Sequence, residues 1–528
     1  LGMAAPANPH LVFFPFPAQG HVTPAFHLAS LLHRCHGFDV TFVHTEHNRR
    51  RLLRARGPDA LAGAPGFRFV TVLDGLPPSD EDAAQDMAAL LLSLPTMVPH
   101  FKRLVLSELP AASCCLVSDV DPILRAAEDI GLPCVSFCTT SASSFMAFQH
   151  LQQLVDKGLV PLKDAEQLRN GYMDKTVIDW MPGLPKAMRL RDFPSFIRTT
   201  DPHDAILALT LSLMECYSIV PSAVIFQTFE ELESQAISAM SDILPPIYAV
   251  GPLPLLLRQA AAGASDDPAV VMVGSSLSKE DRACLDWLDG KRPNSVVFVS
   301  FGSIVKLTDE QLVELAWGMA NSGYEFLWVI RRDQQATTAA DATAVLPSGF
   351  LTETEGRGCV TSWCPQEAVL RHEAVGAFMT HCGWNSMLES IYAGVPMLCW
   401  PFAADQQTNS RMACTEWRVG VEIGEDPKRE EVEAAIRQVM GGERGDELRR
   451  SAAEWKEEVG GGVEGEGRLG DTARWLLLGK SGEGSQRGAC SSGDEHAMNL
   501  LRMFFFSDYY CLLCRDVNFI SIKSYART

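Results

Sequence analysis

A cluster of polar and small residues follows an apolar run late in the chain. The run AVGAFMT (374–380) leads directly into HCGWNS (381–386), which holds a ring nitrogen, an amide and a hydroxyl. In an open parallel α/β sheet, ligands bind outside the carboxyl ends of the strands. If residues 374–380 form such a strand, this cluster faces a ligand crevice.

The helix expected after this cluster offers further hydrogen-bond donors. Gly383 permits a tight turn before the helical segment NSMLESIYAG (385–394). The first N–H groups of a helix have no partner inside it, so they form a site for phosphate. His381, Asn385 and Ser386 add side-chain donors, and Glu389 can accept protons from ribose hydroxyls. The alternative is that Asn385 and Ser386 only cap the helix and that His381 is a core histidine.

Other strand-like runs end in residues that suit the remaining parts of a nucleotide sugar. Trp363 ends one run, and its flat indole can stack on a base. Asp405 and Gln406 follow the run VPMLCWPF (395–402), where a carboxylate beside an amide suits sugar hydroxyls. Ser303 follows VVFVSFG (296–302) in a small turn suited to phosphate. Each feature alone is weak, because a core tryptophan, a helix cap or an ordinary turn would explain it.

The first half holds candidates for proton transfer. His21 follows the first apolar run in PFPAQGH, and Asp119 ends CCLVSD (114–119). Both lie at expected carboxyl ends of parallel strands, so the fold can bring them together. Thr139 in FCTT (137–140) is a weaker candidate for contact with the donor sugar. His21 is also one of 13 histidines, and a position near a glycine turn is its simpler explanation.

Short apolar runs that alternate with helical patterns must position these residues. The alternation runs through the first half, breaks at 254–270, and restarts in the second half. It predicts βαβ units and mostly parallel sheets. The 528 residues exceed a single hydrophobic core. We therefore expect an N-terminal domain (1–253), a linker rich in small residues (254–270), a C-terminal domain (271–458) and an atypical, disordered tail (459–528).

Composition limits the classes of partner and compartment. The formal net charge of −20 disfavours nucleic acid and anionic membranes as partners. No apolar run reaches the roughly 18 residues needed to span a bilayer, so stable membrane insertion is not expected. The 15 cysteines are odd in number and lack zinc-site spacing, which favours a reducing, cytoplasmic location.

Residues 363–406 resemble, almost position for position, the plant secondary-product glycosyltransferase box. The resemblance includes WCPQ (363–366), HCGWNS, Glu389 and the terminal Asp405–Gln406. From about Pro9 to Glu458 the chain looks like a plant family-1 UDP-dependent glycosyltransferase, nearest the cyanohydrin and 7-deoxyloganetin glucosyltransferase group. Outside the box, the supporting segments are PFPAQGHVTP (15–24), DGLPPSD (74–80), RLRDFPSFIRTTDP (189–202) and SFGS (300–303).

The resemblance implies a GT-B-like fold of two facing Rossmann-type domains, with the acceptor in the first and the UDP-sugar in the second. It also implies roles for single residues. Trp363 would stack on uracil with the Cys364 main chain at its edge, and Gln366 and Glu389 would bind the ribose. His381, Asn385, Ser386 and Ser303 would hold the diphosphate. Trp384, Asp405 and Gln406 would contact the sugar, and Gln406 favours glucose.

The implied reaction is an inverting transfer of glucose from UDP-glucose to a hydroxyl of a small plant metabolite, which gives a β-glucoside. His21 would remove the hydroxyl proton, and Asp119 would orient the ring and stabilise the imidazolium. The expected partners are the UDP-sugar and a hydroxylated small-molecule acceptor. No metal or other cofactor is expected, because helix-end and neutral donors can hold the diphosphate.

Two features depart from the family pattern. The stretch after Asp119 is about two residues short, and it creates Asp119-Val120-Asp121, a DxD pair that holds metal in nucleotide-sugar enzymes of another fold. The Gly- and Ser-rich segment 459–528 replaces the family's final helix and is not expected to be a working part. Both features keep open a catalytically impaired UDP-sugar-binding relic. A nucleotide-dependent oxidoreductase is a further alternative, but no GxGxxG turn follows the first strand.

Overall fold

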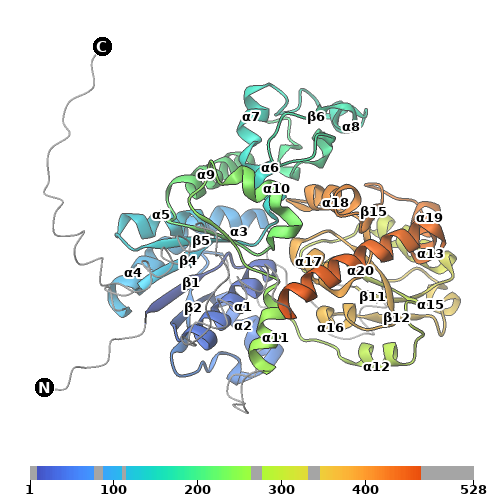
Figure 1. Ribbon diagram of the computed structural model, residues 1–528, viewed down its shortest axis with the longest axis horizontal. Helices are drawn as coiled ribbons and strands as arrows, with labels where there is room; N and C mark the ends of the chain where they lie inside the picture. The colour runs from blue at the N-terminus through green and yellow to red at the C-terminus, as the bar shows by residue number, and fades with distance from the viewer. Residues whose placement is uncertain (1–8, 77–86, 110–113, 263–275, 331–344, 465–528) are drawn as a thin grey trace, which may run out of the picture.

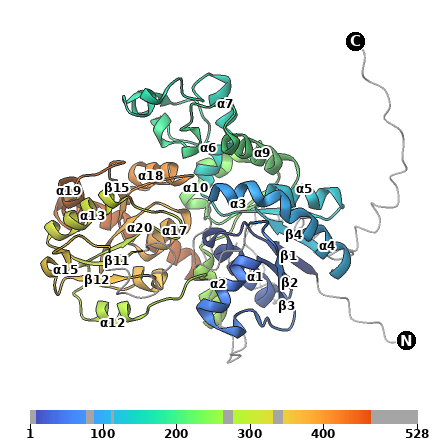
Figure 2. The same cartoon turned by 180° about the vertical axis from the view of Figure 1, so that it is seen from behind.

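Two α/β domains lie side by side in the computed structural model (Figures 1 and 2). The structure describes residues 9–76, 87–109, 114–262, 276–330 and 345–464. A seven-stranded sheet forms the centre of the N-terminal domain, and a six-stranded sheet forms the centre of the C-terminal domain. The predicted class, two Rossmann-type domains with mostly parallel sheets, is confirmed.

The N-terminal sheet has the strand order β3-β2-β1-β4-β5-β8-β9, and each neighbouring pair is parallel. Its strands are β1 (His10–Phe14), β2 (Asp39–Thr45), β3 (Phe67–Val72), β4 (Cys114–Ser118), β5 (Cys134–Cys138), β8 (Val224–Phe226) and β9 (Ile247–Ala249). Residues of a strand alternate between the two faces of its sheet. Val12 and Phe14 therefore pack into one core cluster, and Leu11 and Phe13 into another on the opposite face. Both faces are buried, as expected for a parallel sheet.

Helices cover both faces of this sheet. Their bounds are α1 (Gln19–His36), α2 (Glu46–Arg56), α3 (Met87–Ser93), α4 (Val98–Glu108), α5 (Asp121–Asp129), α6 (Ala142–Gln149), α7 (Leu151–Asp156), α8 (Tyr172–Lys175), α9 (Ala205–Ile219), α10 (Glu230–Met240) and α11 (Leu253–Ala262). A small antiparallel pair, β6 (Val177–Ile178) with β7 (Met188–Arg189), stands away from the main sheet beside α7 and α8 (Figure 1). Short 3₁₀ turns, η4 (Leu190–Asp192) and η5 (Ser195–Ile197), follow β7.

The C-terminal sheet repeats this plan with the order β12-β11-β10-β13-β14-β15. Its strands are β10 (Val296–Ser300), β11 (Glu325–Val329), β12 (Gly358–Thr361), β13 (Val375–Thr380), β14 (Met397–Cys399) and β15 (Gly420–Glu422). Its helices are α12 (Ala283–Asp289), α13 (Asp309–Ser322), α15 (Phe350–Glu353), α16 (Gln366–Leu370), α17 (Trp384–Ala393), α18 (Gln406–Thr415), α19 (Arg429–Met440) and α20 (Gly442–Glu464). None of the helices in the described ranges is long and apolar enough to cross a bilayer.

The expected linker is partly helical. Helix α11 takes up its first nine positions, 254–262, and packs against α1. Leu256 and Leu257 are buried in the N-terminal core together with Leu253, because the three lie at helical spacing on one face. Residues 263–270 lie outside the described residues. Residues 459–464, assigned to the tail by sequence, form the end of α20, and 465–528 lie outside the described residues. The domain boundaries stay a prediction.

Five hydrogen bonds of one kind cross the contact between the domains. Side chains of the C-terminal domain donate hydrogen bonds to main-chain carbonyls of the N-terminal domain. These bonds are Trp384 Nε1 to Gln227 (2.7 Å), Asn385 Nδ2 to Gly20 (2.7 Å), Thr408 Oγ1 to Asp192 (2.7 Å), Arg411 to Ala187 (2.7 Å) and Trp417 Nε1 to Leu232 (3.1 Å). Helices α17 and α18 are thereby held against the first domain (Figure 1).

Candidate active site

Three neighbouring strand ends bring His21, Asp119 and Thr139 together. Strands β1, β4 and β5 lie in this order in the sheet, and the three residues follow their carboxyl ends. His21 Nδ1 lies 2.5 Å from Asp119 Oδ2 and 2.9 Å from Thr139 Oγ1. The His21 side chain is 37% exposed and that of Asp119 only 6%. A carboxylate only accepts hydrogen bonds, so Nδ1 carries the proton and Nε2 keeps a free lone pair.

The short stretch after Asp119 does not turn its side chain away. The second carboxylate oxygen accepts the main-chain N–H of Phe16 at 2.6 Å, and the Tyr217 hydroxyl donates to the Asp119 carbonyl at 3.0 Å. Helix α5 begins two residues later, at Asp121, whose carboxylate pairs with Arg125 at 2.6 Å. The two aspartates of the DxD pair therefore have separate partners. Among the described residues, the structure holds no group of three or more His, Cys, Asp and Glu that could bind a metal ion.

One cavity of about 720 Å³ between the domains collects the predicted residues. All of them line it: His21, Asp119 and Thr139 from the N-terminal domain, and Ser303, Trp363, Cys364, Gln366, His381, Trp384, Asn385, Ser386, Glu389, Asp405 and Gln406 from the C-terminal domain. The second group follows the carboxyl ends of β10, β12, β13 and β14. Both sheets therefore point their strand ends at a shared space, as open α/β sheets do at ligand sites.

His381 is wedged between two glycines at the end of β13. A Cβ atom at Gly302 would lie 2.6 Å from its Cε1, and one at Gly383 would lie 3.0 Å from the same atom. Burial lowers the pKa of His381 to about 4, so the ring is neutral near pH 7. Its Nδ1 is buried without a hydrogen-bond partner among the described residues. A neutral ring with an orphaned nitrogen suits a ligand group in the cavity.

Helix α17 starts without a side-chain cap. Its N-cap is Gly383, and neither Asn385 nor Ser386 bonds back to the helix start. The Asn385 side-chain amide donates to the Gly20 carbonyl of the other domain, and the Ser386 hydroxyl accepts from Gln366 at 2.8 Å. The capping alternative is therefore wrong for this helix. Its first N–H groups lack intrahelical acceptors and can serve an anion.

The indole of Trp384 is engaged at the contact between the domains. It is 3% exposed, and its N–H donates to the Gln227 carbonyl in the other domain. A contact between Trp384 and a sugar would therefore come from its main chain at the helix start. Cys364 is also buried, which leaves its main chain as the part that can meet the edge of a base.

Gln366 and Glu389 form a polar pair beside the start of α17. Gln366 Nε2 donates to Glu389 Oε2 at 2.7 Å. Burial raises the pKa of Glu389 to about 7, although the hydrogen bond from Gln366 and the positive charge of Arg258 oppose the shift. The carboxyl is therefore poised to change its charge near neutral pH. Once ionised, it can accept from two neighbouring hydroxyls.

Asp405 and Gln406 begin α18 at the end of the loop after β14. Asp405 Oδ2 accepts from Thr140 of the other domain and from Asn409, both at 2.9 Å. Burial raises the pKa of Asp405. Gln406 Oε1 accepts the main-chain N–H of Phe402 at 2.9 Å and a second one from the next residue. The side-chain NH₂ of Gln406 is thus the part of its amide that can donate to a ligand.

Comparisons with known proteins agree with this geometry. The family model described as UDP-glucoronosyl and UDP-glucosyl transferase matches residues 273–449. The 7-deoxyloganetin glucosyltransferase of Gardenia jasminoides is 49% identical over 466 residues, which cover 87% of this chain and 94% of that relative. This chain belongs to that transferase family.

A second relative and a crystal structure extend the comparison. The (R)-mandelonitrile beta-glucosyltransferase of Prunus dulcis is 47% identical over 461 residues, or 86% of this chain and 93% of that protein. The crystal structure of Medicago truncatula UGT71G1 complexed with UDP-glucose has a TM-score of 0.72 and 27% identity, and covers 89% of this chain and 98% of its own. The predicted family, its GT-B fold and its glycosyltransferase class are confirmed.

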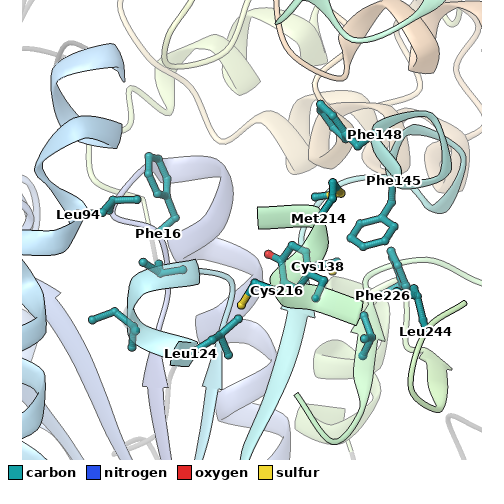
Figure 3. Packing of buried hydrophobic residues seen from close by; sticks show 14 of the residues in the cluster. Phe16, Leu94, Leu124, Cys138, Phe145, Phe148, Met214, Cys216, Phe226 and Leu244 are labelled. Atoms are coloured by element: carbon teal, nitrogen blue, oxygen red, sulfur yellow. The ribbon is translucent and has the colours of Figure 1, made fainter. Parts of the chain in front are cut away.

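In this glycosyltransferase, the part of the cavity that the N-terminal domain lines is rich in apolar side chains. Phe16 and Leu94 lie on one side, and Phe145, Phe148 and Met214 lie on the other (Figure 3). All five are buried. His21 lies beside them, with its ring centre 4.9 Å from that of Phe16. A hydroxyl that approaches His21 would therefore be carried by a largely apolar body.

Sequence reasoning missed the residues that surround Trp363. The Trp363 N–H donates to Ser276 Oγ at 3.0 Å, and the Ser276 carbonyl accepts from Arg56 Nε at 3.1 Å. Ser276 follows the expected linker, and Arg56 belongs to the other domain, so no local pattern joins them to Trp363. Arg258 was also missed: it pairs with Glu367 and lies 5.9 Å from the Tyr392 ring.

Proposed function

We propose that this protein transfers glucose from UDP-glucose to a hydroxyl of a small plant metabolite, with inversion at the anomeric carbon, and so forms a β-glucoside. The observation that carries the proposal is the position of the His21–Asp119 pair in the same cavity as the donor motif. Family membership, and relatives named as glucosyltransferases, support glucose as the donor sugar.

The proton step is assigned to His21. Its Nε2 takes the proton as the acceptor hydroxyl oxygen attacks the anomeric carbon, and the bond from that carbon to the UDP oxygen breaks on the opposite face. Asp119 holds the ring and stabilises the imidazolium that forms. The N–H groups at the start of α17 stabilise the charge that grows on the departing diphosphate. Attack from the face opposite UDP inverts the anomeric carbon.

Donor recognition follows the order of the lining residues. Trp363 stacks on uracil, with the Cys364 main chain at the base edge, and Gln366 and Glu389 bind the ribose hydroxyls. The diphosphate is held by Ser303, His381, Asn385, Ser386 and the α17 start. Asp405 and Gln406 bind the glucose, together with the Trp384 main chain and Thr139.

UDP-glucose is a co-substrate, and we propose that the diphosphate is held by neutral and helix-end donors rather than by a metal. Of the two DxD carboxylates, one binds His21 and the other pairs with Arg125. The apolar acceptor end favours an acceptor with a largely apolar body, because burial of apolar surface is favourable there. Each cysteine in the described ranges is a free thiol, which supports a reducing compartment, and we assign the protein to the cytoplasm.

The test is a screen of hydroxylated acceptors with UDP-glucose, read by mass spectrometry for a mass gain of one hexose. His21→Ala is the matched control, and its turnover is expected to fall by roughly 10²–10⁴ with near-normal UDP affinity. β-Glucoside formation that needs His21 supports the proposal. UDP binding without turnover across the panel would instead indicate a UDP-sugar-binding relic.

A further inference from the structure

The residue before Asp405 has an unusual backbone conformation. Ala404 has a φ of 57°, in the left-handed region that non-glycine residues rarely adopt. It lies in the loop between β14 and α18, directly before Asp405 and Gln406. Because this conformation is unfavourable for alanine, contacts from outside the loop must hold it.

Both main-chain groups of Ala404 bond to one residue of the other domain, while Thr140 and Ser144 of that domain bond to Asp405 itself. The main-chain N–H of Ser195 donates to the Ala404 carbonyl at 3.0 Å, and the Ala404 N–H donates to Ser195 Oγ at 2.8 Å. Ser195 thereby satisfies both main-chain groups of the strained residue. The Ser195 hydroxyl and the Ser195 N–H therefore hold the turn before Asp405 through two hydrogen bonds.

The segment that carries Ser195 is itself firmly anchored. The buried Asp192 takes two hydrogen bonds from Arg189, at 2.7 and 3.0 Å through the side chain, and its carbonyl accepts from Thr408 of α18 at 2.7 Å. Arg191 reaches Glu422 at 3.0 Å, and Arg198 reaches Glu425 at 2.9 Å. These bonds fix the segment against α18 and the end of β15, so Ser195 is presented to Ala404 at a defined position.

We propose that Ser195 is a positioning residue of the donor-sugar site, which holds Ala404 left-handed so that Asp405 and Gln406 face the glucose. The inference rests on the proposed function, because it takes these two residues as the sugar-binding pair. The acceptor domain then completes the sugar site only when the two domains are docked. The uracil, ribose and diphosphate contacts of Trp363, Gln366 and His381 do not depend on Ser195.

The test compares UDP-glucose with UDP, which lacks the sugar. In Ser195→Ala, the calorimetric Kd and the KM for UDP-glucose are expected to rise about 3- to 10-fold through loss of one hydrogen bond, while the Kd for UDP changes less than about twofold. The preference for UDP-glucose over UDP-galactose is expected to fall with it. Ser195→Thr keeps the hydroxyl and is expected to restore the wild-type values.

Trp417→Phe is the matched control, because it removes a bond between the same domains, to the Leu232 carbonyl, outside the segment that carries Ser195. It is expected to lower the melting temperature as Ser195→Ala does, but to leave the UDP-glucose to UDP ratio of Kd unchanged. Equal losses for UDP and UDP-glucose, an equal effect of Trp417→Phe, or no effect of Ser195→Ala would each overturn the inference. If Ser195→Ala does not fold, Ser195→Cys serves in its place.

Failure of the proposed function is a separate result. A wild-type protein that forms no glucoside with any acceptor would reject the proposed reaction. The Kd comparison does not need turnover, so it would still decide the role of Ser195.

Discussion

Replacement of Asp119 by asparagine is expected to reduce turnover more than replacement by alanine. One carboxylate oxygen accepts the Phe16 N–H at 2.6 Å, and the other faces His21 Nδ1 at 2.5 Å. Asparagine has a single side-chain oxygen, and this oxygen accepts the main-chain N–H of Phe16, which cannot reorient. Its NH₂ group then faces Nδ1 and makes that nitrogen an acceptor. The ring proton moves to Nε2, which can no longer take a proton from the acceptor.

The two replacements differ in magnitude. Holding the wrong tautomer is expected to lower kcat by roughly 10³–10⁴. Alanine removes the charge together with the two hydrogen bonds of the carboxylate. Two unit charges about 4 Å apart attract by about 4 kcal/mol at an effective dielectric constant of about 20. Since His21 is 37% exposed, solvent weakens this by about half, which leaves ~2 kcal/mol, or roughly a 30-fold loss. With alanine, Thr139 Oγ1 at 2.9 Å can still accept the Nδ1 proton.

The assay is glucoside formation by mass spectrometry at saturating UDP-glucose and acceptor, with kcat compared for wild type, Asp119→Asn and Asp119→Ala. Asp121→Asn is the control, because this neighbouring carboxylate pairs with Arg125 and not with His21. Melting temperatures establish that each variant is folded, and UDP affinity should not change. The reasoning is refuted if asparagine is tolerated as well as alanine, or if Asp121→Asn causes the same loss.

Three further predictions concern the donor half. Gln406→His is expected to shift the ratio of kcat/KM for UDP-glucose over UDP-galactose toward galactose by about 3- to 10-fold, because one amide NH₂ donor is lost. An unchanged ratio would reject Gln406 as the residue that selects glucose. Burial raises the pKa of Glu389 to about 7, so its carboxyl is mostly protonated below that pH. The calorimetric affinity for uridine is therefore expected to rise as pH increases toward 7, by up to about tenfold per unit. Glu389→Gln should flatten this dependence, and a persisting slope would contradict the assignment. Gly302→Ala is expected to weaken UDP binding at least tenfold. The added Cβ would lie 2.6 Å from His381 Cε1, and a φ of 69° costs about 1 kcal/mol more for alanine than for glycine. A wild-type Kd would show that the close packing of Gly302 against His381 is unimportant for UDP.

The location of the site was predictable because it depends on a property of parallel sheets. Polar residues directly after apolar runs converge at one edge of the sheet, whatever the lengths of the connections between them. His21, Asp119 and Thr139 follow neighbouring strands, and their contact needs only the strand order to be correct. The fold class was predictable for the same reason, since it rests on the alternation of strand and helix patterns.

Side-chain directions and contacts between the domains were not predictable. The indole N–H of Trp384 donates to the other domain, and this depends on where Gln227 comes to lie. Ser276 and Arg56 are 220 positions apart, and only the docked domains bring them together. Helix α11 was interpreted as linker because its small residues and proline outweighed the run of leucines, yet burial against α1 stabilises it.

The use of main-chain carbonyls at the domain contact has a consequence for divergence within the family. A peptide carbonyl is present at a position whatever side chain it carries, so the partners of Trp384, Arg411 and Trp417 survive most substitutions in the first half. Mutation can therefore reshape the apolar end of the cavity without removing these three bonds to the second half. For the same reason, exchange of whole halves between relatives, by recombination in a genome or by design, would preserve these anchoring bonds while it introduces a new acceptor range.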